Sequence, residues 1–175
     1  MAWKQSSWYV FHTFTLDYLP EQKIHYHNFF HSFKILLPCE VCISHYRNQL
    51  SRPGLTLQEN NNDESLFSWT VRIHNNVNSS NQKRVWAIDE ARSYYEKEKS
   101  NINTNIIKTM VLEYVRNNFK KGPIKTEELF VMLNSMRYIY PEEEKRKKLI
   151  SMKTILNRNN IREWLLEFLK IICEV

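Results

Sequence analysis

The segment Pro38-Cys39-Glu40-Val41-Cys42 holds two of the three cysteines in the chain, three residues apart. It follows an aromatic and histidine-rich stretch that runs from Tyr26 to Leu37. A C-x-x-C pair serves either as half of a zinc site or as a redox-active dithiol. The remaining sequence must therefore supply either further metal ligands or an electron acceptor.

Length and composition narrow the class of protein. The chain has 175 residues, of which 42% are hydrophobic, enough for one domain of ordinary size and a small second unit. Its two glycines, Gly54 and Gly122, argue against a glycine-rich phosphate loop. No apolar run is long enough for a membrane span, and the N-terminal residues lack the apolar core of a signal peptide. We therefore expect an intracellular, non-secreted protein, in which three cysteines do not form a disulfide scaffold.

Apolar spacing predicts helices along the first 100 residues and no strand. The predicted helices run from Ser6 or Ser7 to about Tyr18, from Glu21 to Leu37, from Pro38 to about Leu50, along the stripe Leu66, Trp69, Ile73 and Val77, and from Trp86 to about Lys99. A polar loop is expected from Gln58 to Asp63. Both cysteines are predicted to lie in the first turn of the third helix, where the helix dipole favours a thiolate.

Four further amphipathic helices are predicted after Asn101. The first is stopped by Gly122-Pro123, Thr126 caps the second, Pro141 opens the third, and the last carries the stripe Trp164, Phe168 and Ile172. From Asn101 onward there are 14 basic and 9 acidic residues, a net of +5 out of +6 for the chain. This excess indicates either attraction to an acidic partner such as nucleic acid or a solvated helical face, and we expect the second.

The cysteine pair leaves zinc and redox chemistry open at this point. Cys39, Cys42 and His45 could ligate zinc with His12 or His74 as a fourth ligand, but a structural zinc site normally has a second closely spaced pair. Redox chemistry needs an acceptor, and no strand context of a thioredoxin-like fold is present. A flavin held by side chains from helices is the alternative. The candidate side chains are Trp8, His12, Trp69, His74, Asn75, Asn78, Lys83 and Trp86.

The order of these motifs resembles the Erv/ALR family of FAD-linked sulfhydryl oxidases. The family pattern W-x-x-x-H-T is matched from Trp8 to Thr13, and P-C-x-x-C is matched from Pro38 to Cys42. Phe67 and Trp69 approximate the family's F-x-x-W, with a spacing one residue short. The family's H-N-x-V-N with a following lysine is matched by His74-Asn75-Asn76-Val77-Asn78 and Lys83. The resemblance covers about Ser6 to Lys99. It is strongest to the short forms of large DNA viruses, which also lack a bracketing disulfide and a distal shuttle pair.

The resemblance implies an all-α fold, with a four-helix bundle and a short fifth helix over residues 1–100 that grips FAD at its mouth. Residues 101–175 are expected to form a C-terminal helical module without a family counterpart. Cys39 and Cys42 are the expected catalytic pair. The expected cofactor-binding residues are Trp8, His12, Cys42, His45, Trp69, His74, Asn75, Val77, Asn78, Lys83, Trp86 and Tyr95.

The resemblance also implies an activity and its partners. Electrons are expected to pass from a dithiol protein, either thioredoxin-like or a small C-x-x-C protein, through the cysteine pair to FAD. Oxygen then accepts them to give H2O2. We further expect a homodimer and no nucleic-acid partner, in the host cytoplasm or the virion if the protein is viral. The alternative is a non-enzymatic adaptor with structural cysteines and basic nucleic-acid-binding helices; a preparation coloured by flavin would exclude it.

Overall fold

A computed structural model describes residues 2–51, 63–99 and 101–174, and these form helices without any strand. The helices are α1 (Ala2–Thr15), the 3₁₀ helix η1 (Pro20–Gln22), α2 (Lys23–Leu36), α3 (Glu40–Leu50), α4 (Asp63–Ser80), α5 (Ile88–Lys99), α6 (Thr104–Asn118), α7 (Pro123–Ile139), α8 (Glu143–Ile150) and α9 (Ile161–Cys173). The all-α prediction is confirmed.

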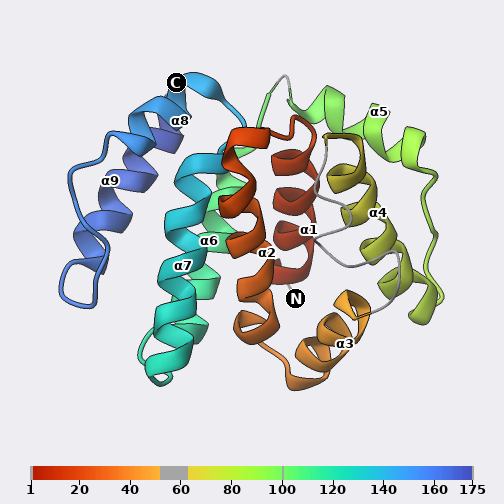
Figure 1. The fold of residues 1–175 in the computed structure, drawn as a ribbon, viewed down its shortest axis with the longest axis horizontal. Coiled ribbons are helices and arrows are strands. Elements are labelled where there is room, and N and C mark those ends of the chain that lie inside the picture. The colour runs from red at the N-terminus through yellow and green to blue at the C-terminus, as the bar shows by residue number, and fades with distance from the viewer. Residues whose placement is uncertain (1, 52–62, 100, 175) are drawn as a thin grey trace.

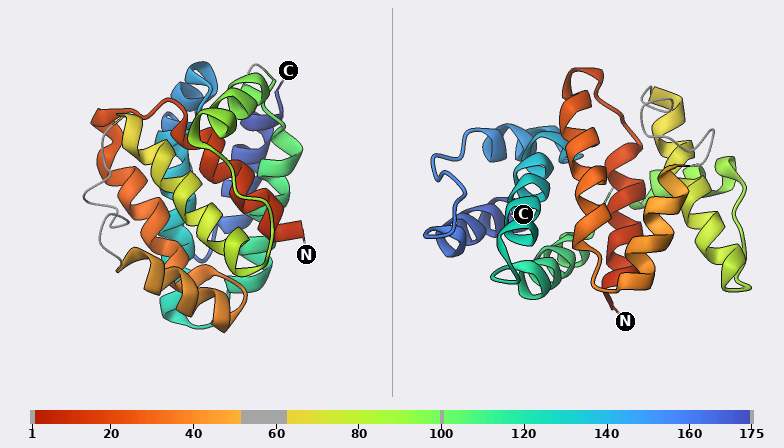
Figure 2. Two further views of the ribbon diagram at one scale, coloured as in Figure 1. Left: turned by 90° about the vertical axis from the view of Figure 1, so that its right-hand side faces the viewer. Right: turned by 60° about the horizontal axis from the view of Figure 1, so that its bottom comes forward.

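Helices α1 and α2 lie at the centre of the molecule (Figure 1). Helices α4 and α5 pack on one side of this pair, and α6 and α7 pack on the other. Helix α3 crosses one end of the bundle, and the α8–α9 pair lies outside α6 and α7 (Figure 2). The chain therefore places the cysteine segment at one end and its C-terminus at the opposite end.

A single hydrophobic core joins both halves of the chain. It contains Phe11, Phe30 and Trp69 from the first 100 residues together with Met132 and Phe168 from the later helices. Burying large apolar side chains of this kind is the main favourable contribution to folding, about 1.5–3 kcal/mol for each side chain. A second, smaller cluster of Leu16, Phe67, Val71 and Ala91 holds α5 against α1 and α4. Helix α5 thus rests on much less buried apolar surface than α6 or α7.

Several helix boundaries in the first half differ from the prediction. Helix α1 begins at Ala2, before Ser6 and Ser7, and both serines are buried within it. Helix α3 begins at Glu40 rather than Pro38, so Cys39 is its N-cap and only Cys42 lies in its first turn. Asp63 is the first residue of α4. The rest of the loop predicted from Gln58 lies outside the described residues.

The start of α7 also differs from the prediction. Helix α7 begins at Pro123 with Gly122 as its N-cap, and Thr126 lies inside the helix with its hydroxyl donating to the Gly122 carbonyl (2.9 Å). Proline suits the first helical position because its fixed φ is helical and its missing N–H is not needed there.

The apolar stripe of α9 is fully buried within the chain, with Trp164, Phe168 and Ile172 all at 0% exposure. Its burial therefore requires no second subunit.

No helix among the described residues has the length and apolar character needed to cross a bilayer.

Candidate active site

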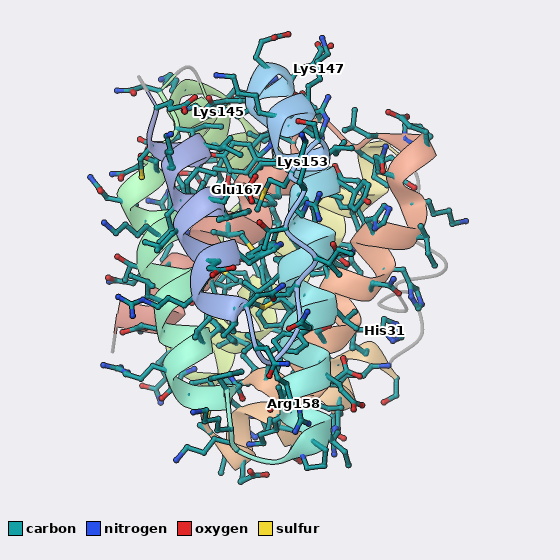
Figure 3. All side chains as sticks on the ribbon, turned by 90° about the vertical axis from the view of Figure 1, so that its left-hand side faces the viewer. His31, Lys145, Lys147, Lys153, Arg158 and Glu167 are labelled. Carbon is teal, nitrogen blue, oxygen red and sulfur yellow. A yellow bond between two sulfur atoms is a disulfide. The ribbon has the colours of Figure 1, made fainter. Side chains whose placement is uncertain are left out.

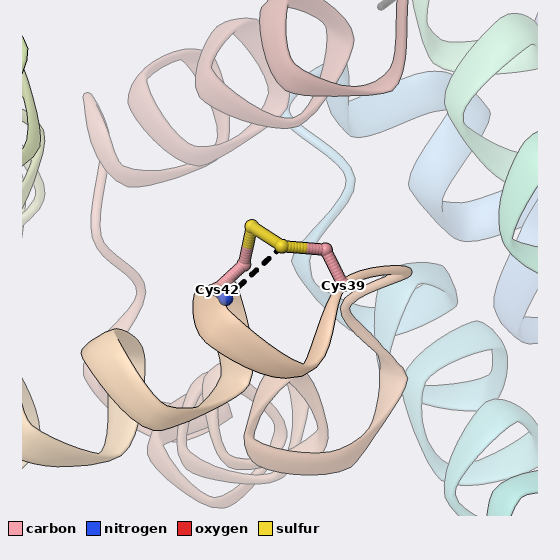
Figure 4. Close-up of a disulfide and its surroundings, with 2 residues drawn as sticks. All are labelled: Cys39 and Cys42. Atoms are coloured by element: carbon pink, nitrogen blue, oxygen red, sulfur yellow. Dashed lines mark hydrogen bonds between the residues drawn. A yellow bond between two sulfur atoms is a disulfide. The ribbon is translucent and has the colours of Figure 1, made fainter.

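Cys39 and Cys42 form a disulfide at the N-terminus of α3, with their Cα atoms 5.1 Å apart (Figure 4). Cys39 has an extended backbone as the N-cap residue, and its sulfur accepts a hydrogen bond from the Cys42 amide (3.1 Å). Both cysteines are half-buried, and Cys42 packs against the main core. A helix N-terminus stabilises negative charge, so a thiolate released from this disulfide lies in a favourable place.

Hydrogen bonds fix α3 relative to its neighbours. The buried Tyr46 hydroxyl donates to the Phe30 carbonyl of α2 (2.9 Å), and Arg47 Nε donates to the Lys34 carbonyl (2.9 Å). On the other side, the Asn76 amide of α4 donates to Gln49 Oε1 (2.9 Å). Helix α3 is therefore held between α2 and α4, which keeps the disulfide in a fixed position relative to the histidine of α4.

Two histidines from different helices meet on the side of α1 that faces α4. His12 Nε2 lies 2.9 Å from His74 Nδ1, and His12 Nδ1 lies 3.0 Å from Thr70 Oγ1. His12 is buried at 1% exposure, whereas His74 is half-buried. The prediction that the W-x-x-x-H-T and H-N-x-V-N motifs belong to one site requires them to meet, and they do so through these two rings.

The hydrogen-bond network assigns a tautomer to each ring. The Thr70 hydroxyl donates to the Phe67 carbonyl (2.7 Å), so its oxygen accepts from His12 Nδ1–H. His12 Nε2 then carries a lone pair and accepts from His74 Nδ1–H. His74 Nε2 is left as an acceptor, and no hydrogen bond to it is found within residues 2–51, 63–99 and 101–174.

Both rings are held neutral by their surroundings. Burial lowers the pKa of His12 well below its usual value, and the neighbouring His74 lowers it further. Burial also lowers the pKa of His74 to about 4, with a smaller contribution from the positive charge of Lys83. Two cations cannot share this space, because each would be desolvated beside a like charge.

Aromatic rings pack against both histidines of the pair. Trp8 stacks on His74 with ring centroids 4.2 Å apart and an interplanar angle of 8°, and Tyr95 lies 4.6 Å from His12. Trp8 and Tyr95 are both half-buried. Trp69 differs from them, because it is fully buried in the core against Phe30 (4.9 Å). The structure thus gathers four of the predicted rings, those of Trp8, His12, His74 and Tyr95, and buries Trp69 in the core.

The two motif asparagines hold the segment that follows α4. Asn75 Nδ2 donates to the Trp86 carbonyl (2.8 Å), and Asn75 Oδ1 accepts from the Trp86 amide (2.9 Å). Asn78 Nδ2 donates to the Arg84 carbonyl (3.0 Å). Lys83 is exposed, and Trp86 is half-buried with the Arg84 guanidinium 5.1 Å from its ring. Both asparagines therefore hold the segment that carries Lys83 and Trp86 against α4.

The other predicted site residues are on α3 and α4. Val77 is half-buried on α4, and His45 is exposed on α3. Within the described part of the chain no three His, Cys, Asp or Glu side chains are grouped so as to hold a metal ion. His12 and His74 bond to each other, and the cysteines are joined to each other. The zinc alternative is therefore without a ligand set in the part of the chain that the structure describes.

Thr70 is a site residue that the sequence analysis missed. It is fully buried and is the hydrogen-bond acceptor that orients His12. The signal was its spacing, since Thr70 and His74 are four residues apart and so share a face of α4. A buried hydroxyl behind a motif histidine orients that ring without contacting a ligand itself.

Comparisons with known proteins agree with this geometry. The family model described as Erv1 / Alr family matches residues 5–100. A protein named "Probable FAD-linked sulfhydryl oxidase" from Acanthamoeba polyphaga mimivirus is 33% identical over 99 residues, covering 54% of this chain and 69% of the relative. An "FAD-linked sulfhydryl oxidase" of African swine fever virus is 35% identical over 83 residues, covering 47% of this chain and 60% of the relative.

Among solved structures, none matches this chain significantly. The family match covers more than half of the chain and includes the disulfide of α3 and both histidines of the α1–α4 pair. This chain belongs to the Erv1 / Alr family.

Proposed function

We propose that this chain is an FAD-linked sulfhydryl oxidase that makes disulfide bonds in dithiol substrates. The observation that carries the proposal is the Cys39–Cys42 disulfide at the start of α3, within the family-matched region. Its half-buried cysteines lie beside an exposed turn, and α3 is fixed against α4, which carries His74. The cysteine pair of α3 and the rings around His74 of α4 are thereby held in fixed positions relative to each other.

The first chemical step is thiol–disulfide exchange. A substrate thiolate attacks the Cys39 sulfur and forms a mixed disulfide, while Cys42 leaves as a thiolate. The second substrate thiol then displaces Cys39, so the substrate leaves as a disulfide and the Cys39–Cys42 pair has gained two electrons and two protons. The N-terminus of α3 stabilises the thiolates formed on the way. Glu40, in the first turn of that helix, partly offsets this stabilisation because it carries a like charge.

FAD supplies the two-electron acceptor that reoxidises the cysteine pair and delivers the electrons to O2 as H2O2. The site residues suit such a group, because it combines flat rings with a pyrophosphate. Trp8, His74 and Tyr95 offer ring faces, while Lys83 and Arg84 offer positive charge. His74 Nε2 offers a lone pair, so the atom it meets must carry a donor such as the amino group of adenine or a ribose hydroxyl.

We also propose the rest of the cofactor site, the substrate class and the location. Cys42, His45, Trp69, Val77 and the two motif asparagines complete the proposed flavin-binding set; Trp69 contributes from the buried side of the cluster. We place the substrate among thioredoxin-like or small C-x-x-C proteins and the enzyme in the host cytoplasm or virion. We retain residues 1–100 as the oxidase domain and 101–175 as a helical module packed on it.

The homodimer is likewise proposed from the family resemblance. The apolar stripe of α9 is buried within one chain, so α9 contributes to a dimer only through its outer face. Light scattering on the full-length chain tests this expectation: a monomeric mass would contradict it. Truncation at Asn101 is a poor test, because it would uncover the faces of α1 and α2 that α6 and α7 bury.

The test of the oxidase function begins with colour. A purified protein should be yellow, and it should turn over a small dithiol with release of H2O2. Cys42→Ser should abolish flavin reduction by thiols while flavin stays bound. Cys39→Ser should keep Cys42 free beside the flavin and should give a long-wavelength charge-transfer band. A preparation that stays colourless after incubation with FAD would overturn the proposal.

A matched pair of histidine variants tests the placement of the cofactor. His74→Ala should lose flavin readily, because it removes both the ring stacked on Trp8 and the partner of His12. His27→Ala on α2 should retain flavin, because His27 stacks on His31 at 3.9 Å, outside the site. Equal retention in the two variants would contradict the assignment of His74.

A further inference from the structure

The turn between α6 and α7 lies beside the turn that carries the disulfide. The buried Asn118 at the end of α6 donates from Nδ2 to the Leu36 carbonyl (3.0 Å), and Leu36 is the last residue of α2, three residues before Cys39. Both turns lie at the same end of the molecule (Figures 1 and 2). A segment outside the family-matched residues 5–100 therefore borders the reactive pair.

This end of the molecule is rich in positive charge. Residues 114–126 contain four basic residues and no acidic one, and Glu40 is the single acidic residue of residues 22–58. Lys120 and Lys121 are both exposed in the turn, as is Arg47 on α3. A group of exposed positive charges raises the local concentration of an acidic partner and speeds its association.

Lys120 has a backbone conformation that is energetically unfavourable for a lysine. Its φ is +64°, a left-handed region that glycine or asparagine occupies more easily. Its ammonium lies 5.6 Å from the ring of Phe119, which holds the side chain without neutralising it. Strained residues that persist in a structure are concentrated at functional positions. The conformation thus gives a reason, independent of charge counting, to ask what the lysine does.

Apolar side chains are exposed among these cations. Val41, between the two cysteines, is 63% exposed, and Ile124, at the start of α7, is 65% exposed. A protein partner that reaches the disulfide would cover these apolar side chains. Single-stranded nucleic acid, by contrast, is bound chiefly by stacking of its bases on exposed aromatic rings. The aromatic side chain of the α6–α7 turn (residues 119–122), Phe119, is half-buried and packs against the main core and Phe130, so its ring is not freely exposed for stacking.

We propose that the α6–α7 turn is a docking surface for an acidic dithiol protein, which it holds over Cys39 through Lys120 and Lys121. This inference rests on the proposed oxidase function, because it assigns the substrate class of the same disulfide. It gives residues 101–175 a role in substrate selection that the family-matched region does not supply.

The test uses reduced peptides with one C-x-x-C core, flanked on both sides by glutamates, by glutamines or by lysines. The flavin-loaded full-length enzyme should prefer the glutamate peptide over the lysine peptide in kcat/KM, by about tenfold at low ionic strength. The preference should disappear near 1 M salt, where the Debye length is about 3 Å. The double variant Lys120→Glu, Lys121→Glu should lose or invert the preference while it keeps wild-type turnover of a small uncharged dithiol.

The matched control reverses two exposed lysines at the other end of the molecule. Lys153 lies near the α8 end (Figure 3), and Lys170 lies one turn before the C-terminus. Lys153→Glu, Lys170→Glu changes the net charge by the same amount and should leave the preference intact. If both double variants lose it equally, net charge and not the turn is responsible, and the inference fails.

A second variant separates docking from folding. Lys120→Gly relieves the left-handed strain, so it should raise the melting temperature and still weaken the preference for the glutamate peptide. An unchanged preference in this variant and in the double variant would overturn the inference while leaving the oxidase function standing. Binding of a single-stranded oligonucleotide, and not of the glutamate peptide, in a Lys120-dependent manner would also overturn it. Failure of the wild type to oxidise the small dithiol would instead reject the oxidase function.

Discussion

Buried polar side chains serve different ends in the family-matched region and in helices α6–α9. In the first, His12 and His74 hydrogen-bond each other and leave a ring nitrogen of His74 to act as an acceptor. In the second, the buried Arg137 donates to the main-chain carbonyls of Leu149, Ile150 and Met152 and so closes the end of α8. The first arrangement leaves a polar atom without a hydrogen-bond partner among the described residues, whereas the second uses its donors on the fold itself.

The largest effect is expected where the later helices enter the shared core. Phe168→Ala removes a fully buried ring of α9 and should lower the free energy of unfolding by about 3–5 kcal/mol. Urea unfolding measures this, and Leu166→Ala, at a residue 62% exposed on the same helix, should change stability by at most about 0.5 kcal/mol. Similar losses in the two variants would mean that α9 is not part of the core.

The next effect concerns the structural use of buried donors. Arg137→Met keeps much of the side-chain volume but leaves the carbonyls at the end of α8 without their donor. We expect a loss of about 2–3 kcal/mol in unfolding free energy, with flavin affinity unchanged. Arg158→Met, at an exposed residue, is the control. A loss of flavin in Arg137→Met without a loss of stability would break the comparison drawn above.

The histidine pair should make stability depend on pH. The pKa of His74 is 6.5 without burial and about 4 in the folded protein. Its contribution is therefore fully present above pH 6.5 and is lost as the pH falls toward 4, because the unfolded chain takes up a proton that the folded site excludes. We expect a loss of about 2–3 kcal/mol over this range, measured by urea unfolding at several pH values.

A second histidine outside the site provides the control for this pH effect. The pKa of His31 on α2 is also lowered to about 4, by burial first and then by His27 and Lys34. His74→Gln should remove the part of the pH dependence that comes from the site, and His31→Gln should remove a separate part. A pH profile that His74→Gln leaves unaltered would show that the site does not exclude the proton.

The smallest of these effects tests the network behind the site. Thr70→Val removes the acceptor of His12 Nδ1–H while keeping the shape of the side chain. Flavin affinity should fall about tenfold, equivalent to about 1.4 kcal/mol, and Thr70→Ser should restore it. Equilibrium dialysis measures the affinity. If Thr70→Val instead lowers only the stability, this network is structural, as the one around Arg137 is.

Local sequence signals identified most helices and the two histidines. Proline misled the prediction twice. Pro38 and Pro141 suit the first turn of a helix, yet each precedes the N-cap residue of its helix, Cys39 and Glu142. At the first of these the Cys39 sulfur accepts the hydrogen bond of a capping residue. Pro123 does occupy the first position of its helix. The same residue type is compatible with both positions, so sequence alone did not choose between them.

Contacts between distant segments were beyond the reach of the sequence analysis. The stripe of α9 was correctly predicted to be buried, but whether it met this chain or another depended on how α6 and α7 pack on α1 and α2. Asn75 remains a predicted cofactor-binding residue, and its amide also holds both main-chain groups of Trp86. A motif gives the identity of its side chains, whereas their partners depend on the path of the chain that follows.

The shared core also sets the order in which the protein can mature. The Ser7 and Tyr114 hydroxyls lie 3.1 Å apart although 107 residues separate them, and the Asn103 amide donates to the Tyr9 hydroxyl (2.8 Å). A ribosome adds about 5–20 residues per second, so the oxidase region waits for several seconds with its α1–α2 face uncovered. During that interval Cys39 and Cys42 are already synthesised but not yet supported by a finished fold. The nascent chain is thus most prone to aggregation before α7 emerges from the ribosome.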